Sequence, residues 1–106
     1  MQIRTTSAFV AIVTQGKPVF DLTDQTSGVR LRAWYLATPS GDAVVQVHRG
    51  ETQVREFLFP AYKVWNLAAH FDDIVASEVA QDVDGYAVAA SDGLGGSAGF
   101  RPVEKP

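Results

Sequence analysis

The fold of this chain is decided by residues 29–59, which read VRLRAWYLATPSGDAVVQVHRGETQVREFLF. Three segments of this stretch are rich in β-branched and aromatic residues and are separated by turn sequences. The segments are 29–37, 43–48 and 52–59. The second turn, Arg49-Gly50-Glu51, is so short that the strands on either side of it must pair as an antiparallel hairpin. The stretch therefore predicts three consecutive antiparallel strands.

The first of these strands has two unlike faces, because successive side chains of a strand point to opposite sides. Val29, Leu31 and Tyr35 share an apolar face, whereas Arg30, Arg32 and Trp34 share the other. We call the second one the mixed face. Continuing the alternation across the hairpin assigns more side chains to it. The residues predicted to form an interaction surface there are Arg30, Arg32, Trp34, His48, Arg55 and Phe57.

The flanking segments complete an α+β pattern. Residues 7–14 and a short segment beginning at Pro18 predict two further strands. Because proline cannot donate to a ladder, the second strand either lies at a sheet edge or begins at Pro18. Pro60 suits the first turn of a helix, and apolar residues recur at helical spacing through residues 61–80. We expect an antiparallel meander of about five strands with one long amphipathic helix packed on one face.

The end of the chain predicts a short strand and then a tail. Residues 86–90, YAVAA, read as a final strand, and the glycine-rich stretch that follows has too little apolar side chain to build regular structure. We expect residues 1–90 to form a single α+β domain. Residues 91–106 are expected to form an extended tail docked on the body or on a neighbouring subunit.

Composition limits the class of protein. A chain of 106 residues with 46% hydrophobic and 20% charged residues fits one globular domain. No apolar run is long enough to span a bilayer, and residues 1–13 lack the features of a signal peptide, which predicts a cytoplasmic protein with no membrane partner. The absence of cysteine excludes disulfides and thiolate chemistry. A net charge of −3 argues against strong electrostatic capture of nucleic acid.

No motif predicts catalysis, a metal site or a cofactor. Residues 93–98, GLGGSA, fit a dinucleotide-binding pattern, but the helix that this mechanism needs does not follow. His70 and Asp73 could meet on adjacent helical turns, yet they belong to the polar stripe that any helix packed on a sheet must show to solvent. An enzyme, or a small-ligand pocket assembled from distant residues, therefore ranks third among the functions considered.

The order of strands followed by one helix, over residues 28–80, is similar in layout to small single-strand-binding domains of the whirly and Pur types, with residues 57–60 leading into the helix. No motif matches residue by residue, so no binding residue is carried over. Such a resemblance implies single-stranded nucleic-acid binding through the mixed face, where guanidinium groups would pair with phosphates and rings would stack on bases. This is the alternative function.

The first choice is a small, non-enzymatic interaction module that self-associates. Trp and Arg are enriched at protein contacts, and a small sheet with one bare face often buries it in a symmetric dimer. We expect a homo-oligomer, with a dimer favoured, or contact with another protein partner. Trp34 would be the interface anchor, with Trp65 and Phe100 as further oligomer contacts.

Overall fold

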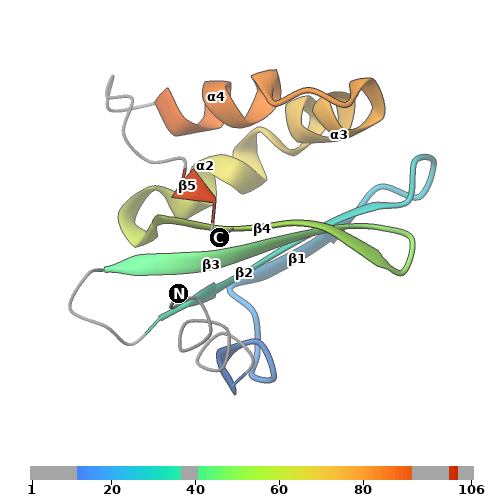
Figure 1. Ribbon diagram of the computed structural model, residues 1–106. Helices are drawn as coiled ribbons and strands as arrows, with labels where there is room; N and C mark the ends of the chain where they lie inside the picture. Colours follow the sequence, from blue (N-terminus) through green and yellow to red (C-terminus); the bar gives the residue numbers. More distant parts are fainter. Residues whose placement is uncertain (1–11, 37–40, 92–100, 103–106) are drawn as a thin grey trace.

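Five strands form one antiparallel sheet in the order β1-β2-β3-β4-β5, so that every strand pairs with its neighbour in sequence (Figure 1). The computed structural model describes residues 12–36, 41–91 and, by their backbone, 101–102. The strands are β1 Phe20–Thr23, β2 Val29–Tyr35, β3 Asp42–Arg49, β4 Thr52–Pro60 and β5 Arg101–Pro102. The predicted α+β class with an antiparallel sheet is confirmed. The three strands predicted from residues 29–59 are all present.

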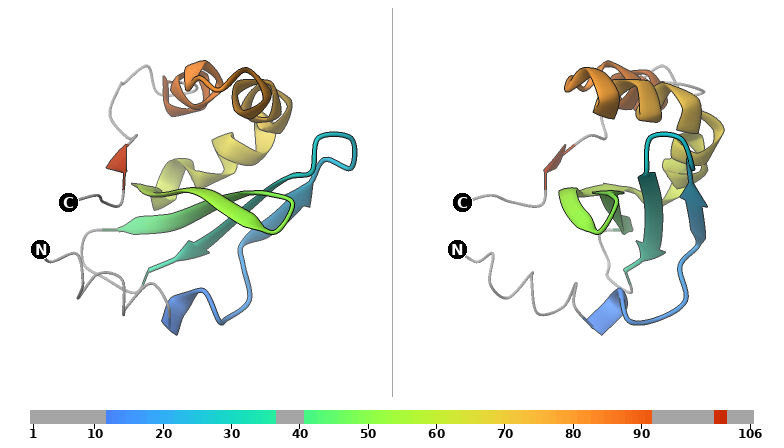
Figure 2. Two further views of the ribbon diagram at one scale, coloured as in Figure 1. Left: turned by 45° about the vertical axis from the view of Figure 1, so that its right-hand side comes forward. Right: turned by 90° about the vertical axis from the view of Figure 1, so that its right-hand side faces the viewer.

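The helices of residues 61–91 follow β4 in sequence and cover one face of the sheet (Figures 1 and 2). They are the single 3₁₀ turn η1 Ala61–Lys63 and the α-helices α2 Val64–Ala69, α3 Phe71–Ala80 and α4 Asp84–Ser91. The segregation of strands from helices leaves the opposite face of the sheet, which is the mixed face, without a helix from residues 61–91.

The hydrophobic core fills the space between the sheet and the helices. Its sheet side is built by alternate residues of β2, β3 and β4, and its helix side by inward residues of α2, α3 and α4. The fully buried large side chains include Leu31, Phe57, Phe59, Leu67, Ile74 and Tyr86. Burying such groups is the main stabilising contribution, about 1.5–3 kcal/mol for each side chain.

The single long helix predicted over residues 61–80 is wrong in detail. His70 adopts φ −108° and ψ 29°, which ends α2 and begins α3. In Figure 1, α3 leaves the direction of α2, and α4 returns above α2. Apolar residues at three- and four-residue steps indicate which face of each helical turn is buried. The same spacing fits either one helix or two helices joined at a single non-helical residue.

Two predicted strands are also wrong where the structure describes them. Residues 86–90 are helical and belong to α4. A short apolar run does not by itself distinguish a strand from a buried helical segment, and tertiary packing of Tyr86 decides between them here. Ile12 and Val13 form a helical turn, with Gly16 N–H donating to the Val13 carbonyl at 3.0 Å. The rest of the strand predicted over residues 7–14 lies outside the described residues.

An irregularity between β3 and β4 changes which side chains share a face. His48 pairs with Gln53 but Val47 pairs with Arg55, so β4 carries one extra residue, Val54, at this point. Such a β-bulge shifts the alternation of the bulged strand by one residue. Beyond it, Arg55, opposite Val47, lies on the helix-covered face. The prediction that placed Arg55 and Phe57 on the mixed face is therefore wrong.

The C-terminal end returns to the sheet. β5 pairs antiparallel with β4, with Arg101 opposite Leu58 and Pro102 opposite Phe57. Phe100 and the glycine-rich residues 93–98 lie outside the described residues. In the described part of the chain, no helix is both long enough and apolar enough to cross a membrane.

Candidate functional site

The mixed face carries a polar row that crosses four strands. Register places Asp21 opposite Arg32, Arg32 opposite Gln46, and Gln46 opposite Glu56. Residues directly opposite each other in an antiparallel pair point to the same side and interact. The Gln46 amide donates to Glu56 Oε2 at 2.8 Å. Polar side chains from distant parts of the sequence are thereby joined into one surface.

Arg30 forms an ion pair with Asp21. Its Nε and Nη2 donate to the two carboxylate oxygens of Asp21 at 2.8 and 2.7 Å, which is the bidentate geometry that suits a guanidinium. The hydrogen bonds from Arg30 hold the pKa of Asp21 below its ordinary value, and the same pairing raises the pKa of Arg30. The pair is partly exposed, so it contributes little to the free energy of unfolding.

Arg32 has much weaker partners. Its Nη2 lies 3.4 Å from both Gln46 Oε1 and His48 Nε2, and its buried Nε has no hydrogen-bond partner among the described residues. No described carboxylate forms an ion pair with it at the distance that joins Arg30 to Asp21. Burial lowers the pKa of Arg32, and the positive charge of Arg30 acts in the same direction. The guanidinium is thus a cation with unused donor capacity.

His48 is the titratable group next to this cation. Burial lowers its pKa below the ordinary value of 6.5, and the positive charges of Arg32 and Arg30 lower it further. Asp21 and Glu56 oppose this effect but do not reverse it. The imidazole is therefore neutral near pH 7, and its Nε2 can accept the long contact from Arg32.

Trp34 is part of the mixed face but does not protrude from it. Only 2% of the residue is exposed, its indole N–H donates to the Gly16 carbonyl at 3.0 Å, and the Arg32 guanidinium lies 5.0 Å from the ring centroid. The prediction that Trp34 is an exposed interface anchor is therefore wrong. A cation over an indole is a favourable contact, so Trp34 positions Arg32.

Arg55 and Phe57 belong to a second network under the helices. Arg55 Nε donates to Glu78 Oε2 at 2.5 Å, and the Tyr86 hydroxyl donates to the same oxygen at 2.5 Å. Phe57 meets Tyr86 edge to face with ring centroids 5.6 Å apart. Burial raises the pKa of Tyr86, and the hydrogen bond to Glu78 adds to the effect. The polar groups of Arg55, Glu78 and Tyr86 form hydrogen bonds with one another, which is typical of a structural network.

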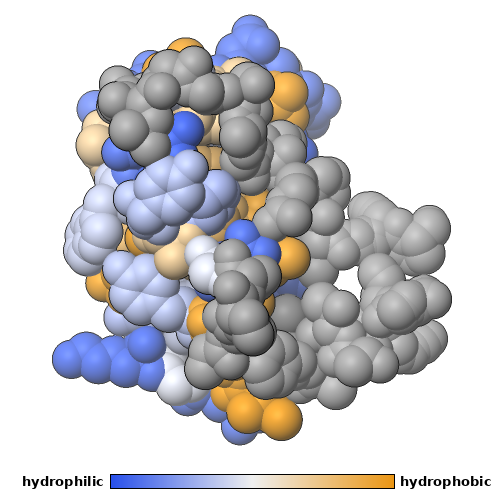
Figure 3. Space-filling view, turned by 90° about the vertical axis from the view of Figure 1, so that its left-hand side faces the viewer, coloured by the Kyte–Doolittle hydropathy of each residue, from blue (hydrophilic) through white to orange (hydrophobic). Residues whose placement is uncertain are grey.

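The exposed aromatic side chains lie elsewhere, at the end of the sheet where β2 stops and β4 leads into η1. Tyr35, Tyr62 and Trp65, which we call the aromatic end, are 51, 73 and 56% exposed. Trp65 is held against Phe20, with ring centroids 5.2 Å apart. Figure 3 views the molecule from this end, where pale blue side chains of slightly negative hydropathy, the range of Tyr and Trp, gather around orange hydrophobic ones.

Two ionisable residues next to the aromatic end, Lys63 and Asp42, are buried. Lys63 stands between Tyr62 and Trp65 in sequence, yet it is buried and donates through Nζ to the Ala90 carbonyl. Asp42, at the start of β3 on the same end of the sheet, is buried as well. Neither side chain therefore adds a charge to the exposed surface of the aromatic end.

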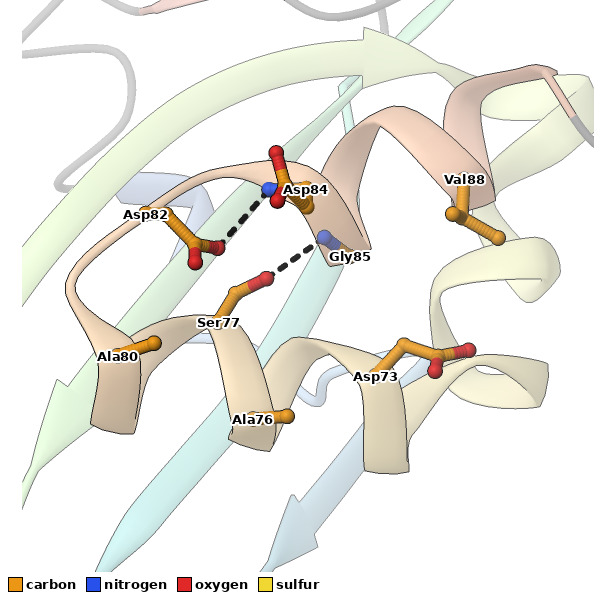
Figure 4. A pocket seen from close by; sticks show the side chains of 8 residues that line it. All are labelled: Asp73, Ala76, Ser77, Ala80, Asp82, Asp84, Gly85 and Val88. Carbon is orange, nitrogen blue, oxygen red and sulfur yellow. Dashed lines mark hydrogen bonds between the residues drawn. The ribbon is translucent and has the colours of Figure 1, made fainter.

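An open groove of about 280 Å³ runs between α3 and α4. Figure 4 shows Ser77 and Gly85 facing each other across it, with the Gly85 N–H donating to Ser77 Oγ at 2.6 Å. Asp73 and Asp82 lie apart from each other along the groove. An added Cβ on Gly85 would lie 2.2 Å from the Asp73 carbonyl oxygen, so only glycine allows the two helices to approach this closely.

The predicted proximity of His70 and Asp73 is observed. His70 Nδ1 lies 3.1 Å from Asp73 Oδ2, on the helical layer and away from the mixed face. Within the described ranges, no group of three or more His, Asp or Glu side chains is arranged to hold a metal ion.

Comparisons with protein-family models, with curated proteins and with solved structures give no match to this chain. The candidate sites therefore depend on their own geometry. Of the predicted interaction residues, Arg30, Arg32 and His48 are brought together on one open surface, Trp34 lies buried beside them, and Arg55 and Phe57 are on the opposite face. Trp65 is exposed, as a residue in an oligomer contact would be.

Several residues of these sites were missed from the sequence. Asp21 and Glu56 complete the polar row, and Tyr35 and Tyr62 complete the aromatic end. The sequence places Tyr35 on the apolar face of β2, but the residue is 51% exposed at the end of the strand. A signal for Tyr62 exists in the sequence, since it follows Pro60 in the first helical turn, where one side faces solvent.

Proposed function

We propose that this chain is a small, non-enzymatic binding module that self-associates through its aromatic end, with a dimer as the favoured state. The observation that carries this proposal is the exposure of Tyr35, Tyr62 and Trp65 at one end of the sheet. Tyrosine and tryptophan are the residues that most often dominate interface energetics, because they bury a large area with little loss of side-chain freedom.

Trp65 is the best candidate for the anchor. Its ring is more than half exposed, but its contact with Phe20 limits the conformations that it samples. An anchor that is already ordered in the free protein loses less conformational entropy when a partner covers it. Trp65 therefore takes the role that the sequence had suggested for Trp34.

A second copy of the chain is favoured as the partner because two ionisable residues next to the aromatic end are buried. In a symmetric dimer the same patch meets itself, so any net charge on it would oppose an equal charge. Because Lys63 and Asp42 are buried, neither of them adds to this repulsion. The core of a protein interface is likewise depleted in charged residues.

Single-stranded nucleic-acid binding through the mixed face is less favoured. Base stacking needs an open ring, and Trp34 is buried. The net charge of −3 also opposes a polyanion.

The test is the solution mass of the full chain over a dilution series, measured by sedimentation equilibrium. We expect a monomer–dimer equilibrium, and Trp65→Ala should raise the dimer dissociation constant about tenfold or more, as removal of a hot-spot residue does. Trp34→Phe is the matched control, because it changes the other tryptophan at a buried position. Urea unfolding of each variant separates weaker association from lower stability. A monomeric mass at millimolar protein, or equal effects of the two substitutions, would contradict the proposal.

A further inference from the structure

We propose that Arg32 and His48 form a binding site for a phosphate group carried by a small molecule, with Arg30 at its rim. The site lies on the mixed face, away from the helices, and does not depend on self-association through the aromatic end. The two arginines of β2 differ in their partners.

Arg30 and Arg32 are two residues apart on one strand and share a face, but only Arg30 has a carboxylate partner in the described part of the chain. Arg32 makes two contacts at 3.4 Å, to Gln46 and His48, at the long end for hydrogen bonds. Its buried Nε makes no hydrogen bond to a described residue. The charge of Asp21, which lies opposite Arg32, acts on it, but both Asp21 oxygens are engaged by Arg30. An oxyanion bound at the Arg32 guanidinium would supply a charge partner of its own.

The guanidinium is fixed in place before any ligand arrives. It lies 5.0 Å from the centroid of the Trp34 ring, and that ring is in turn held by the hydrogen bond from its indole N–H to Gly16. A preorganised guanidinium loses less freedom on binding. The contact with Trp34 therefore makes Arg32 a better binding group than a free surface arginine.

His48 supplies the second contact. It lies directly opposite Arg30 in the register, and its Nε2 faces Arg32 Nη2. Guanidinium and imidazole side by side present donors to an oxyanion once the imidazole is protonated, and a bound anion favours that protonation. Asp21 and Glu56 are the described carboxylates whose charges act on His48. Asp21 is engaged by Arg30, and Glu56 accepts a hydrogen bond from Gln46.

The geometry favours a phosphate on a small molecule over a nucleic-acid backbone. A polymer needs a track of cations, whereas the described residues of this face offer one guanidinium without a carboxylate partner and one histidine next to it. The net charge of −3 repels a long polyanion more strongly than a single phosphate.

The two histidines of the chain make a direct test feasible, because His70 on the helical layer serves as an internal control. We would follow the imidazole Cε1–H resonances of the full chain by NMR, at fixed pH near neutrality and constant ionic strength, while adding inorganic phosphate. The expected result is a saturable shift of the His48 resonance with His70 unchanged, together with a higher His48 pKa in phosphate than in chloride.

Three variants sharpen the test. Arg32→Gln should abolish the saturable shift, and Arg32→Lys, which keeps the charge and is less disruptive to folding, should weaken phosphate binding about tenfold because an ammonium lacks the planar fork. Glu56→Gln removes a nearby negative charge and should tighten binding. Unchanged affinity in Arg32→Lys, or weaker binding in Glu56→Gln, would count against the site.

A parallel titration with an oligothymidylate identifies the source of the phosphate. Saturation by the oligonucleotide at far lower concentration than by inorganic phosphate would overturn the small-molecule part of the proposal in favour of a nucleic-acid backbone. Equal movement of both histidines, or a shift that chloride reproduces, would overturn the site itself.

Discussion

Two arginine networks lie on opposite faces of the same sheet, and they differ in how completely their polar groups are paired. Under the helices, Arg55 and the Tyr86 hydroxyl both donate to Glu78 at 2.5 Å. On the mixed face, Arg32 makes polar contacts at 3.4 Å and its Nε has no hydrogen-bond partner among the described residues. We call Arg55, Glu78 and Tyr86 the closed network, because their polar groups are paired with one another. We call Arg32 with its neighbours Gln46 and His48 the open network.

This difference shows that residue type alone does not indicate a role. Both arginines lie against an aromatic ring, with the Arg55 guanidinium 5.2 Å from the Tyr86 centroid and that of Arg32 5.0 Å from Trp34. Burial opposes the charge of Arg55, but the hydrogen bond and charge of Glu78 outweigh it and raise its pKa, whereas the pKa of Arg32 is lowered. A guanidinium with an acid is a structural element, and one without an acid is available to a ligand.

The largest expected effect comes from opening the closed network. Glu78→Gln removes the charge that Arg55 and Tyr86 share, and we expect it to lower the free energy of unfolding by about 3 kcal/mol, near the lower end for a broken buried pair because Arg55 keeps some contact with solvent. Urea denaturation measures this. Glu51→Gln, the same change on the exposed β3–β4 turn, is the control and should be nearly neutral. A loss as small as that of the control would show that the closed network is not structural.

A smaller effect is expected from moving the helix that carries Tyr86. In Gly85→Ala the new Cβ would meet the Asp73 carbonyl oxygen at 2.2 Å, so α4 must shift away from α3. We expect a loss of about 2 kcal/mol, as for other overpacked sites, whereas Ser77→Ala, which removes only the hydrogen bond to the Gly85 N–H, should cost about 1 kcal/mol.

The combination of Gly85→Ala with Glu78→Gln sharpens this result. Both substitutions act through the contact between Tyr86 and Glu78, so their combined effect on urea unfolding should be smaller than the sum of the two. Strict additivity would show that the position of α4 does not control the closed network.

The smallest effect concerns pH and the open network. The folded-state pKa of His48 lies below 6.5, so between these two values the unfolded chain binds a proton that the folded protein does not. Stability should therefore be constant above pH 6.5 and fall as the pH drops from 6.5 through the folded pKa. Denaturation midpoints one unit above and one unit below 6.5 measure this in the native protein, in His48→Gln and in His70→Gln.

His48→Gln should flatten the dependence, and His70→Gln should leave the His48 contribution in place. The carboxylates with lowered pKa values, Asp21 and Asp24, act below 3.8 and do not enter this window. If the pH dependence were unchanged in His48→Gln, the burial of the His48 imidazole would not affect the free energy of unfolding.

Much of the sheet could be predicted because its signals are local. Alternation in residues 29–35 and the short turn at Gly50 define β2, β3 and β4, and the proximity of Arg30, Arg32 and His48 follows from them. The assignment of Arg55 and Phe57 failed at one residue, Val54, because the extra position in β4 moves all later side chains to the other face. The mistake about Trp34 had a different cause: the face was right, but the segment around Gly16 also lies against it.

The sequence by itself determined an α+β chain with an antiparallel meander, a helical layer that begins after Pro60, and a sheet face on which two arginines meet a tryptophan. Only the tertiary structure decided which arginine is paired and which tryptophan is exposed. Strand periodicity, turn length and proline are properties of neighbouring residues, and they act wherever the segment lies. Pairing and exposure depend on contacts such as Arg55 with Glu78 or Trp65 with Phe20, which join residues far apart in the chain and exist only once the layers have packed.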